Sequence, residues 1–353
     1  GLELRASAKH GPAGIEAGYN IVYQNNTIDS LGIANRDCLD TRSKDGNLAH
    51  NNVIRNNIIR NAGAYEATKD TFGVGVNLIQ GTHHTLLEGN TVLNCAEVGL
   101  QSYGPYDGSS PPHDNIFRKN FVTTAWTDRS GGINFGWTVY NELAEDNVVI
   151  NTRHGIDFDS AITGTNTYRH NMVYNGLELL IVMSNSYGDS NNSVVERNVL
   201  VPGPVTVEGF WCRSMSGKKI ANASFKNNIV GTRSNSFPAI AVGKACDLDS
   251  DNNVFFSTST EHAHAFSWNG DPWTDSTWYA TLAEWQKASG LDAHSKQVGP
   301  GAASKCSGLQ SCCTAGTFPD PSAKSACSSI VAQSVAESCA GVLDILKTNG
   351  WCK

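Results

Sequence analysis

The chain has 353 residues, of which 34 are glycine and 17% are charged, and its formal net charge is −7. This length can bury a sizeable core, but the composition lacks the Leu, Ala, Glu and Lys richness of a helical protein. The acidic balance, without a basic run, argues against nucleic acid as a partner, and no apolar stretch reaches the length of a membrane span.

An asparagine recurs nine times, each time followed two positions later by an aliphatic residue or phenylalanine. The intervals are 24 to 33 residues, and the asparagines are Asn26, Asn57, Asn90, Asn120, Asn147, Asn171, Asn198, Asn228 and Asn253. This period, with short β-branched runs, is typical of a solenoid in which each repeat forms one coil. We therefore predict an all-β, right-handed parallel β-helix of about nine coils, with the asparagines stacked at one corner and hydrogen-bonded along the axis.

A second family of strands precedes these segments and has the form Gly-apolar-polar, as in Gly75-Val76-Asn77 and Gly99-Leu100-Gln101. Strand alternation places the apolar residues inside and the polar ones in one outward row, which comprises Asn77, Gln101, Asn134 and Asp157. Later segments, 179–183, 206–211 and 239–242, continue this sheet with a less polar face. The polar row is the natural floor of a groove for a polymer chain.

Two acids, Asp157 and Asp159, are two positions apart on one predicted strand, so their carboxylates face one side about 6.5 to 7 Å apart. This separation suits an inverting glycosidase; clustered carboxylates also suit Ca²⁺, and two solvated acids are the plainest interpretation. Arg153 and His154 open the same strand, where Arg153 can pair with a substrate carboxylate and His154 can titrate near neutrality. No cofactor other than Ca²⁺ is indicated.

A loop from Gly104 to Asp114 leaves the predicted barrel beside the polar row. Tyr103-Gly104, Asp107 and Pro112-His113-Asp114 resemble a stretched form of the Tyr-Gly-x-Asp-Pro-His motif of mannuronan C5-epimerases, which are β-helix enzymes. The chain departs from that motif by an insertion between Asp107 and Pro112. The resemblance implies that Tyr103 and His113 transfer protons and that Asp107 supports them. Candidate substrate contacts are then Asn77, Gln101, Asp107, Asn134, Trp137, Arg153 and His154.

The last part of the chain changes character. Trp268, Trp273, Trp278 and Trp285 accompany a short helical pattern, which predicts a cap over the open end of the solenoid. The segment from Leu282 to Ser295 resembles the closing segment of secreted β-helix proteins of the pectate-lyase-like superfamily. We therefore expect a capped β-helix over residues 1–300 and a cysteine-rich, partly helical tail over 301–353.

Ten cysteines and three N-glycosylation sequons, at Asn25, Asn191 and Asn222, predict a secreted protein, glycosylated at those sites. Cys212 and Cys246 are 34 residues apart, close to one coil, and are expected to link neighbouring coils. Six cysteines of the tail allow fifteen pairings, so their connectivity stays open. The start at Gly1, without Met or a signal sequence, is expected of a processed or partial chain.

These patterns favour an extracellular protein that acts on a polysaccharide. The first hypothesis is a lyase or C5-epimerase that abstracts a proton from a uronate through Tyr103 or His113. The second is an inverting glycoside hydrolase that uses Asp157 and Asp159. The third is a structural or adhesive β-helix without catalysis, which associates with copies of itself or coats a surface.

Overall fold

The computed structural model describes most of the chain. The described residues are 3–5, 13–16, 18–29, 38–42, 49–63, 73–104, 110–124, 131–159, 164–184, 189–204, 208–213, 218–233, 238–258, 266–268, 277–299 and 303–353. Asp107 lies outside these residues, and Asp159 is described by its backbone alone.

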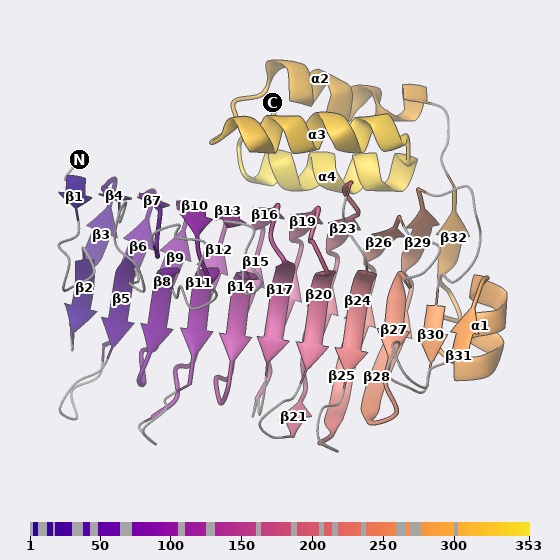
Figure 1. The fold of residues 1–353 in the computed structure, drawn as a ribbon, viewed down its shortest axis with the longest axis horizontal. Coiled ribbons are helices and arrows are strands. Elements are labelled where there is room, and N and C mark those ends of the chain that lie inside the picture. Colours follow the sequence, from indigo (N-terminus) through magenta and orange to yellow (C-terminus); the bar gives the residue numbers. More distant parts are fainter. Residues whose placement is uncertain are drawn as a thin grey trace.

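Three long sheets run side by side along a solenoid and confirm the predicted parallel β-helix (Figure 1). Sheet 1 contains β1 (Glu3–Arg5), β4 (Thr27–Asp29), β7 (Ile58–Arg60), β10 (Thr91–Cys95), β13 (Phe121–Thr124), β16 (Val148–Ile150), β19 (Met172–Tyr174), β23 (Val199–Val201), β26 (Ile229–Thr232), β29 (Val254–Ser257) and β32 (Lys296–Val298). Sheet 2 contains β2 (Ala13–Glu16), β5 (Leu39–Arg42), β8 (Val74–Ile79), β11 (Val98–Tyr103), β14 (Gly131–Gly136), β17 (His154–Asp159), β20 (Leu179–Ser184), β24 (Glu208–Arg213), β27 (Ile240–Val242), β30 (Phe266–Trp268) and β31 (Thr277–Tyr279). Sheet 3 contains β3 (Val22–Gln24), β6 (Val53–Arg55), β9 (Leu86–Glu88), β12 (Ile116–Arg118), β15 (Leu143–Glu145), β18 (Thr167–Arg169), β21 (Ser190–Asn191), β22 (Val194–Glu196), β25 (Ile220–Lys226) and β28 (Cys246–Asp251).

The nine asparagines form one continuous ladder, as predicted. Each side-chain Oδ1 from Asn57 to Asn253 accepts hydrogen bonds from the backbone N–H and the side-chain amide of the preceding asparagine. From Asn57 onward, each side-chain amide also donates to a backbone carbonyl, for example from Asn147 to Phe117 at 2.9 Å. The turn between sheets 3 and 1 is thereby hydrogen-bonded to the corresponding turns of the coils before and after it.

A second polar ladder lies at the turn into sheet 3, and one of its members is an acid. Asn52, Asn115 and Asn166 accept backbone N–H groups of neighbouring coils there, and Glu142 takes the place between Asn115 and Asn166. The Glu142 Oε1 atom accepts from Ser102 at 3.0 Å and from the Asn115 amide at 2.9 Å. Burial raises the pKa of Glu142 to about 8, against the opposing effect of these hydrogen bonds, so the folded protein holds this acid protonated at neutral pH.

Replacing Glu142 by Gln is expected to stabilise the protein increasingly as the pH rises. The folded pKa of about 8 lies above the ordinary value of 4.5, so wild-type stability falls between these two pH values, whereas a glutamine side chain has no proton to lose. The gain in free energy of unfolding should be small near about pH 5 and reach a few kcal/mol near about pH 9. Urea unfolding at both pH values measures it. Glu88→Gln, on the outer face of sheet 3, is the control, and an equal effect of Glu142→Gln at both pH values would contradict the assignment.

Gly132 and Gly155 of sheet 2 face the interior where this sheet approaches sheet 1. A Cβ atom on Gly132 would lie 2.3 Å from the Val149 side chain, and one on Gly155 would lie 2.1 Å from that of Val173. Any side chain at these positions would overlap a core valine, so the narrow cross-section of the solenoid requires glycine.

The C-terminal end of the solenoid is closed by helix α1 (Leu282–Ser289) (Figure 1). Thr281 and Glu284 form a capping box at its start. Trp285 is fully buried against Phe266 and donates from Nε1 to Asp292 at 2.9 Å. Asp292 in turn accepts from Asn253, the last asparagine of the ladder. The segment predicted to close the β-helix therefore covers the end of the hydrophobic core and provides a hydrogen-bond acceptor for the last asparagine of the ladder.

The cysteine-rich tail folds into three helices that lie along the outer face of sheet 1 (Figure 1). They are α2 (Ser307–Ala315), α3 (Pro321–Gln333) and α4 (Ala336–Thr348), preceded by the short 3-10 helix η1 (Ala303–Cys306). Disulfides join Cys306 to Cys339, Cys312 to Cys352 and Cys313 to Cys327. Outward side chains of β13 to β29 share one apolar core with these helices, so the tail covers a face that would otherwise expose large apolar residues.

The predicted bridge between neighbouring coils is confirmed. Cys212 of β24 and Cys246 of β28 form a disulfide with a Cα–Cα distance of 6.1 Å. In the described residues, no helix combines the length and apolar character needed to cross a membrane. The sequon residues Asn25 and Asn222 are exposed, and Asn191 is partly buried.

Candidate functional site

The outward polar row of sheet 2 has the predicted register. Asn77 pairs with Gln101, Gln101 with Asn134, and Asn134 with Asp157, each on the next strand along the axis. In the described part of the chain, the Oδ1 atoms of Asn134 and Asp157 are buried and have no hydrogen-bond partner. Buried polar atoms without partners are costly, so these two acceptors are an unusual feature of the row.

An aromatic pair lies beside the row. Tyr103, at the end of β11, stacks on Trp137 with ring centroids 5.4 Å apart. Its ring covers Gly136, where an added Cβ would lie 2.3 Å from the Tyr103 ring. Gly136 therefore leaves the space in which Tyr103 lies across the neighbouring coil. Stacked aromatic rings next to amides are suited to binding a sugar, which has both apolar ring faces and hydroxyl groups.

Four charged groups meet where β17 and β20 begin. His154 contacts Asp157 Oδ2 through Nδ1 at 3.2 Å and Glu178 Oε2 through Nε2 at 3.1 Å. Arg153 donates to Glu178 Oε1 at 2.7 Å. This network, called the His154 quartet below, joins two cations and two carboxylates at the edge of the polar row.

The quartet shifts the pKa values of His154 and Glu178 in the directions that favour their charged forms. Burial alone lowers the pKa of His154, but the hydrogen bonds to Asp157 and Glu178 outweigh it and raise the pKa to about 9. The hydrogen bond from His154 lowers the pKa of Glu178 to about 2; burial opposes this effect, and Arg153 adds to it. His154 is therefore an imidazolium at neutral pH and a fixed positive charge next to Asp157.

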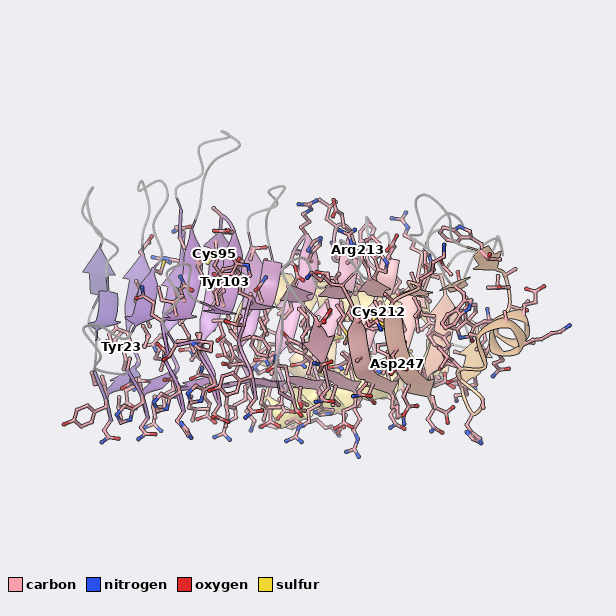
Figure 2. The ribbon with its side chains drawn as sticks, turned by 90° about the horizontal axis from the view of Figure 1, so that it is seen from below. Tyr23, Cys95, Tyr103, Cys212, Arg213 and Asp247 are labelled. Atoms are coloured by element: carbon pink, nitrogen blue, oxygen red, sulfur yellow. A yellow bond between two sulfur atoms is a disulfide. The ribbon has the colours of Figure 1, made fainter. Side chains whose placement is uncertain are left out.

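The face of sheet 2 becomes apolar beyond Asp157, as expected. Val182 and Trp211 continue the row and pack with Leu179 and Ala241 in a small buried cluster. The Arg213 guanidinium lies 4.3 Å from the centre of the Trp211 ring. Figure 2 shows Tyr103 and Arg213 on the same long side of the solenoid. In this row, the positions that follow Asp157 on β20, β24 and β27 are thus apolar.

Other predicted site residues lie elsewhere or are not described. His113 precedes sheet 3, where its ring stacks between His83 and Tyr140 and its Nδ1 contacts Asp114 at 2.6 Å. Its ring therefore belongs to the turn into sheet 3, whereas Tyr103 ends a strand of sheet 2. Asp107 and the side chain of Asp159 lie outside the described residues, so the predicted pairing of Asp159 with Asp157 stays a prediction.

Sequence reasoning missed two residues of this site. Glu178 is 24 residues after His154, one repeat interval, and this spacing could have indicated that it faces His154 across coils. Gly136 takes the strand position that Tyr103 occupies on the preceding coil, and a comparison of the two strands would have shown the missing side chain. Both signals depend on aligning the coils in space.

No known protein family and no curated protein matches the sequence. Among solved structures, the chain is similar to the surface adhesin PfbA of Streptococcus pneumoniae, with 11% identity, a TM-score of 0.44, and coverage of 74% of this chain and 69% of that one. It is also similar to the A-module of the Azotobacter vinelandii mannuronan C-5 epimerase AlgE4, with 15% identity, a TM-score of 0.41, and coverage of 72% and 70%. A mannuronic acid specific polysaccharide family 6 lyase from human gut microbiota matches at 12% identity, with a TM-score of 0.37 and coverage of 76% and 78%. Likenesses at this level assign no activity, and the register of its own strands identifies the chain as a parallel β-helix protein.

Proposed function

We propose that the protein is secreted and acts on a uronate-containing polysaccharide, which it binds along the outer face of sheet 2. The observation that carries the proposal is the amide row Asn77, Gln101 and Asn134 flanked by the Tyr103–Trp137 pair and by the His154 imidazolium. The disulfides within the chain agree with an oxidising compartment. The chemical step we propose is abstraction of the C5 proton, with Tyr103 as the proton-transfer group.

The electrostatics of the site support this step. The C5 proton of a uronate becomes acidic only when negative charge developing on its carboxylate is stabilised. In this proposal the amide donors of the row supply that stabilisation, and His154 and Arg153 add positive charge that Asp157 and Glu178 partly offset. Removal of the C5 proton leaves a carbanion that is stabilised by the carboxylate group. The reaction is that of a lyase if this carbanion expels the glycosidic oxygen at C4, and that of an epimerase if C5 is reprotonated on its other face.

Hydrolysis by Asp157 and Asp159 is less well supported. An inverting hydrolase needs one carboxyl group that holds its proton until it protonates the leaving group. Asp157 Oδ2 is instead held by the His154 imidazolium at 3.2 Å, which leaves this oxygen poorly placed to protonate a leaving group. The same imidazolium repels a divalent cation, so the described residues around Asp157 do not fit a Ca²⁺ site.

A binding protein without catalysis is the second candidate. The observation in its favour is that the His154 quartet balances its own charges, two positive and two negative, in a closed network. Such a network can simply hold two coils together beside a surface that binds sugar. In that case the protein would adhere to a polysaccharide, or assemble on it, and leave it intact.

A polysaccharide panel in D₂O distinguishes these candidates. Polymannuronate, polyguluronate, polygalacturonate and a neutral glucan are incubated with the protein and followed by ultraviolet absorbance, reducing ends and NMR. We expect deuterium at C5 of a uronate, or a C4–C5 double bond, with at least one acidic polymer. New reducing ends without unsaturation would favour hydrolysis, and binding without any change would favour adhesion. Absence of both binding and turnover across the panel would overturn the proposal.

A further inference from the structure

A column of stacked rings runs along the corner where the chain enters sheet 3. It consists of Tyr19, His50, His83, His113 and Tyr140, which contribute one ring from each of five consecutive coils. Neighbouring centroids are 4.7 to 5.3 Å apart and the ring planes differ by 8° or less. Three successive histidines in such a column place imidazole nitrogens of different coils close together.

His84 adds a third imidazole next to His83 and His113. It has a left-handed backbone conformation, with φ of 52°, at a position where the next coil has Asp114. Its ring stands edge-on to both others, with centroids 5.0 Å from His83 and 6.1 Å from His113. The Nδ1 atoms of His83 and His84 are 2.7 Å apart, and one nitrogen from each of the three rings lies within 4.8 Å of the others.

Asp114 completes the group. Its Oδ2 atom is 2.6 Å from His113 Nδ1, and a carboxylate on one nitrogen fixes the ring and leaves the other nitrogen able to bind an ion.

We propose that His83, His84 and His113 bind a divalent transition-metal ion of the Zn²⁺ type, with Asp114 as the residue that orients His113. Imidazole nitrogens are preferred ligands of Zn²⁺ and of the neighbouring late transition metals. The site is independent of the proposed polysaccharide chemistry on sheet 2. It gives His113 a role other than the proton transfer inferred from its sequence motif.

Small movements of exposed or half-exposed rings would complete the site. Two nitrogens bound tetrahedrally to Zn²⁺ are about 3.3 Å apart, given bond lengths of about 2.0 Å, so the hydrogen-bonded His83 and His84 nitrogens must separate slightly. His84 is exposed, so its ring can move without disturbing the core. The parallel rings of His83 and His113 direct their lone pairs along parallel lines, so His113, with 21% of its side chain exposed, must tilt toward the ion.

The test uses the full chain, without a histidine tag and treated with a chelator. Titration with Co²⁺ should give the visible absorption of a nitrogen-coordinated ion, and calorimetry with Zn²⁺ should give one ion per chain. His84→Gln should weaken Zn²⁺ binding by at least about tenfold, and Asp114→Asn by about tenfold to a hundredfold. Because His84 is exposed, its variant should keep the wild-type unfolding midpoint without metal, which separates loss of the site from loss of the fold.

Two controls address the other histidines. His294→Gln, at an exposed position next to Asp251, should leave binding unchanged. The double variant His262→Gln with His264→Gln, which removes the chain's other closely spaced histidine pair, should also leave it unchanged. The proposal is overturned if the wild type binds neither ion, if His84→Gln retains full affinity, or if the double variant loses the Co²⁺ absorption.

Discussion

Replacement of Asn147 by Ala is expected to lower the free energy of unfolding by about 3 to 5 kcal/mol. The Asn147 side chain is fully buried near the middle of the ladder. Its Oδ1 accepts from the backbone and side-chain amides of Asn120, both at 3.0 Å, and its Nδ2 donates to Phe117 O at 2.9 Å and Asn171 Oδ1 at 3.0 Å. Alanine removes all four hydrogen bonds, although the Asn120 side-chain amide keeps its bond to Leu87 O and Asn171 Oδ1 keeps the Asn147 backbone N–H. Each buried group left without a partner costs about 1 to 3 kcal/mol before relaxation.

Equilibrium unfolding in urea measures this loss. Gln24→Ala is the control, because the Gln24 amide is exposed on sheet 3 and bonds only to an arginine side chain in the described contacts; a change within about 0.5 kcal/mol is expected for it. Asn147→Asp keeps the shape and the acceptor, but its carboxylate can donate to neither Phe117 O nor Asn171 Oδ1 and adds a buried charge, so it should be at least as destabilising at neutral pH. If Asn147→Ala lost less than about 1 kcal/mol, the ladder would have no special role in stability.

Replacement of Tyr103 by Phe is expected to reduce kcat on a responsive polysaccharide by about a hundredfold or more. The substitution removes one hydroxyl and keeps the ring that covers Gly136 and stacks on Trp137. Binding of the sugar should therefore persist, with KM changed by no more than about threefold, while the proton-transfer group is lost. Steady-state kinetics on the polymer identified by the panel provides both values.

Two further variants test whether a loss of activity in Tyr103→Phe comes from the missing hydroxyl. Tyr19→Phe is the matched control, since Tyr19 is exposed and lies in the column of stacked rings at the turn into sheet 3, and it should retain full activity. Gly136→Ala should displace the Tyr103 ring and reduce activity while the hydroxyl is still present, which tests its position. Full activity in Tyr103→Phe would remove Tyr103 from the reaction, whereas equal losses in Tyr103→Phe and Tyr19→Phe would indicate a general effect on folding.

The repeat itself could be predicted from the sequence because it follows from local periods. An asparagine every 24 to 33 residues and the two-residue alternation of short strands are both properties of chain order. Together they determine which residues stack, so the asparagine ladder, the outward row from Asn77 to Asp157 and the Cys212–Cys246 bridge could be predicted. A stacked solenoid converts sequence position almost directly into spatial position.

The tertiary structure alone decided contacts that depend on rotation about side-chain bonds or on faces packed across the solenoid. His154 bridges Asp157 and Glu178, and Tyr103 crosses to Gly136 of the next coil, because the side chains of adjacent coils share one surface. The tail is cross-linked by three disulfides and lies on sheet 1, where the outward residues are apolar. The sequence period determines the position of each residue along the solenoid axis. The direction in which its polar atoms point depends also on neighbours 24 or more residues away in the sequence.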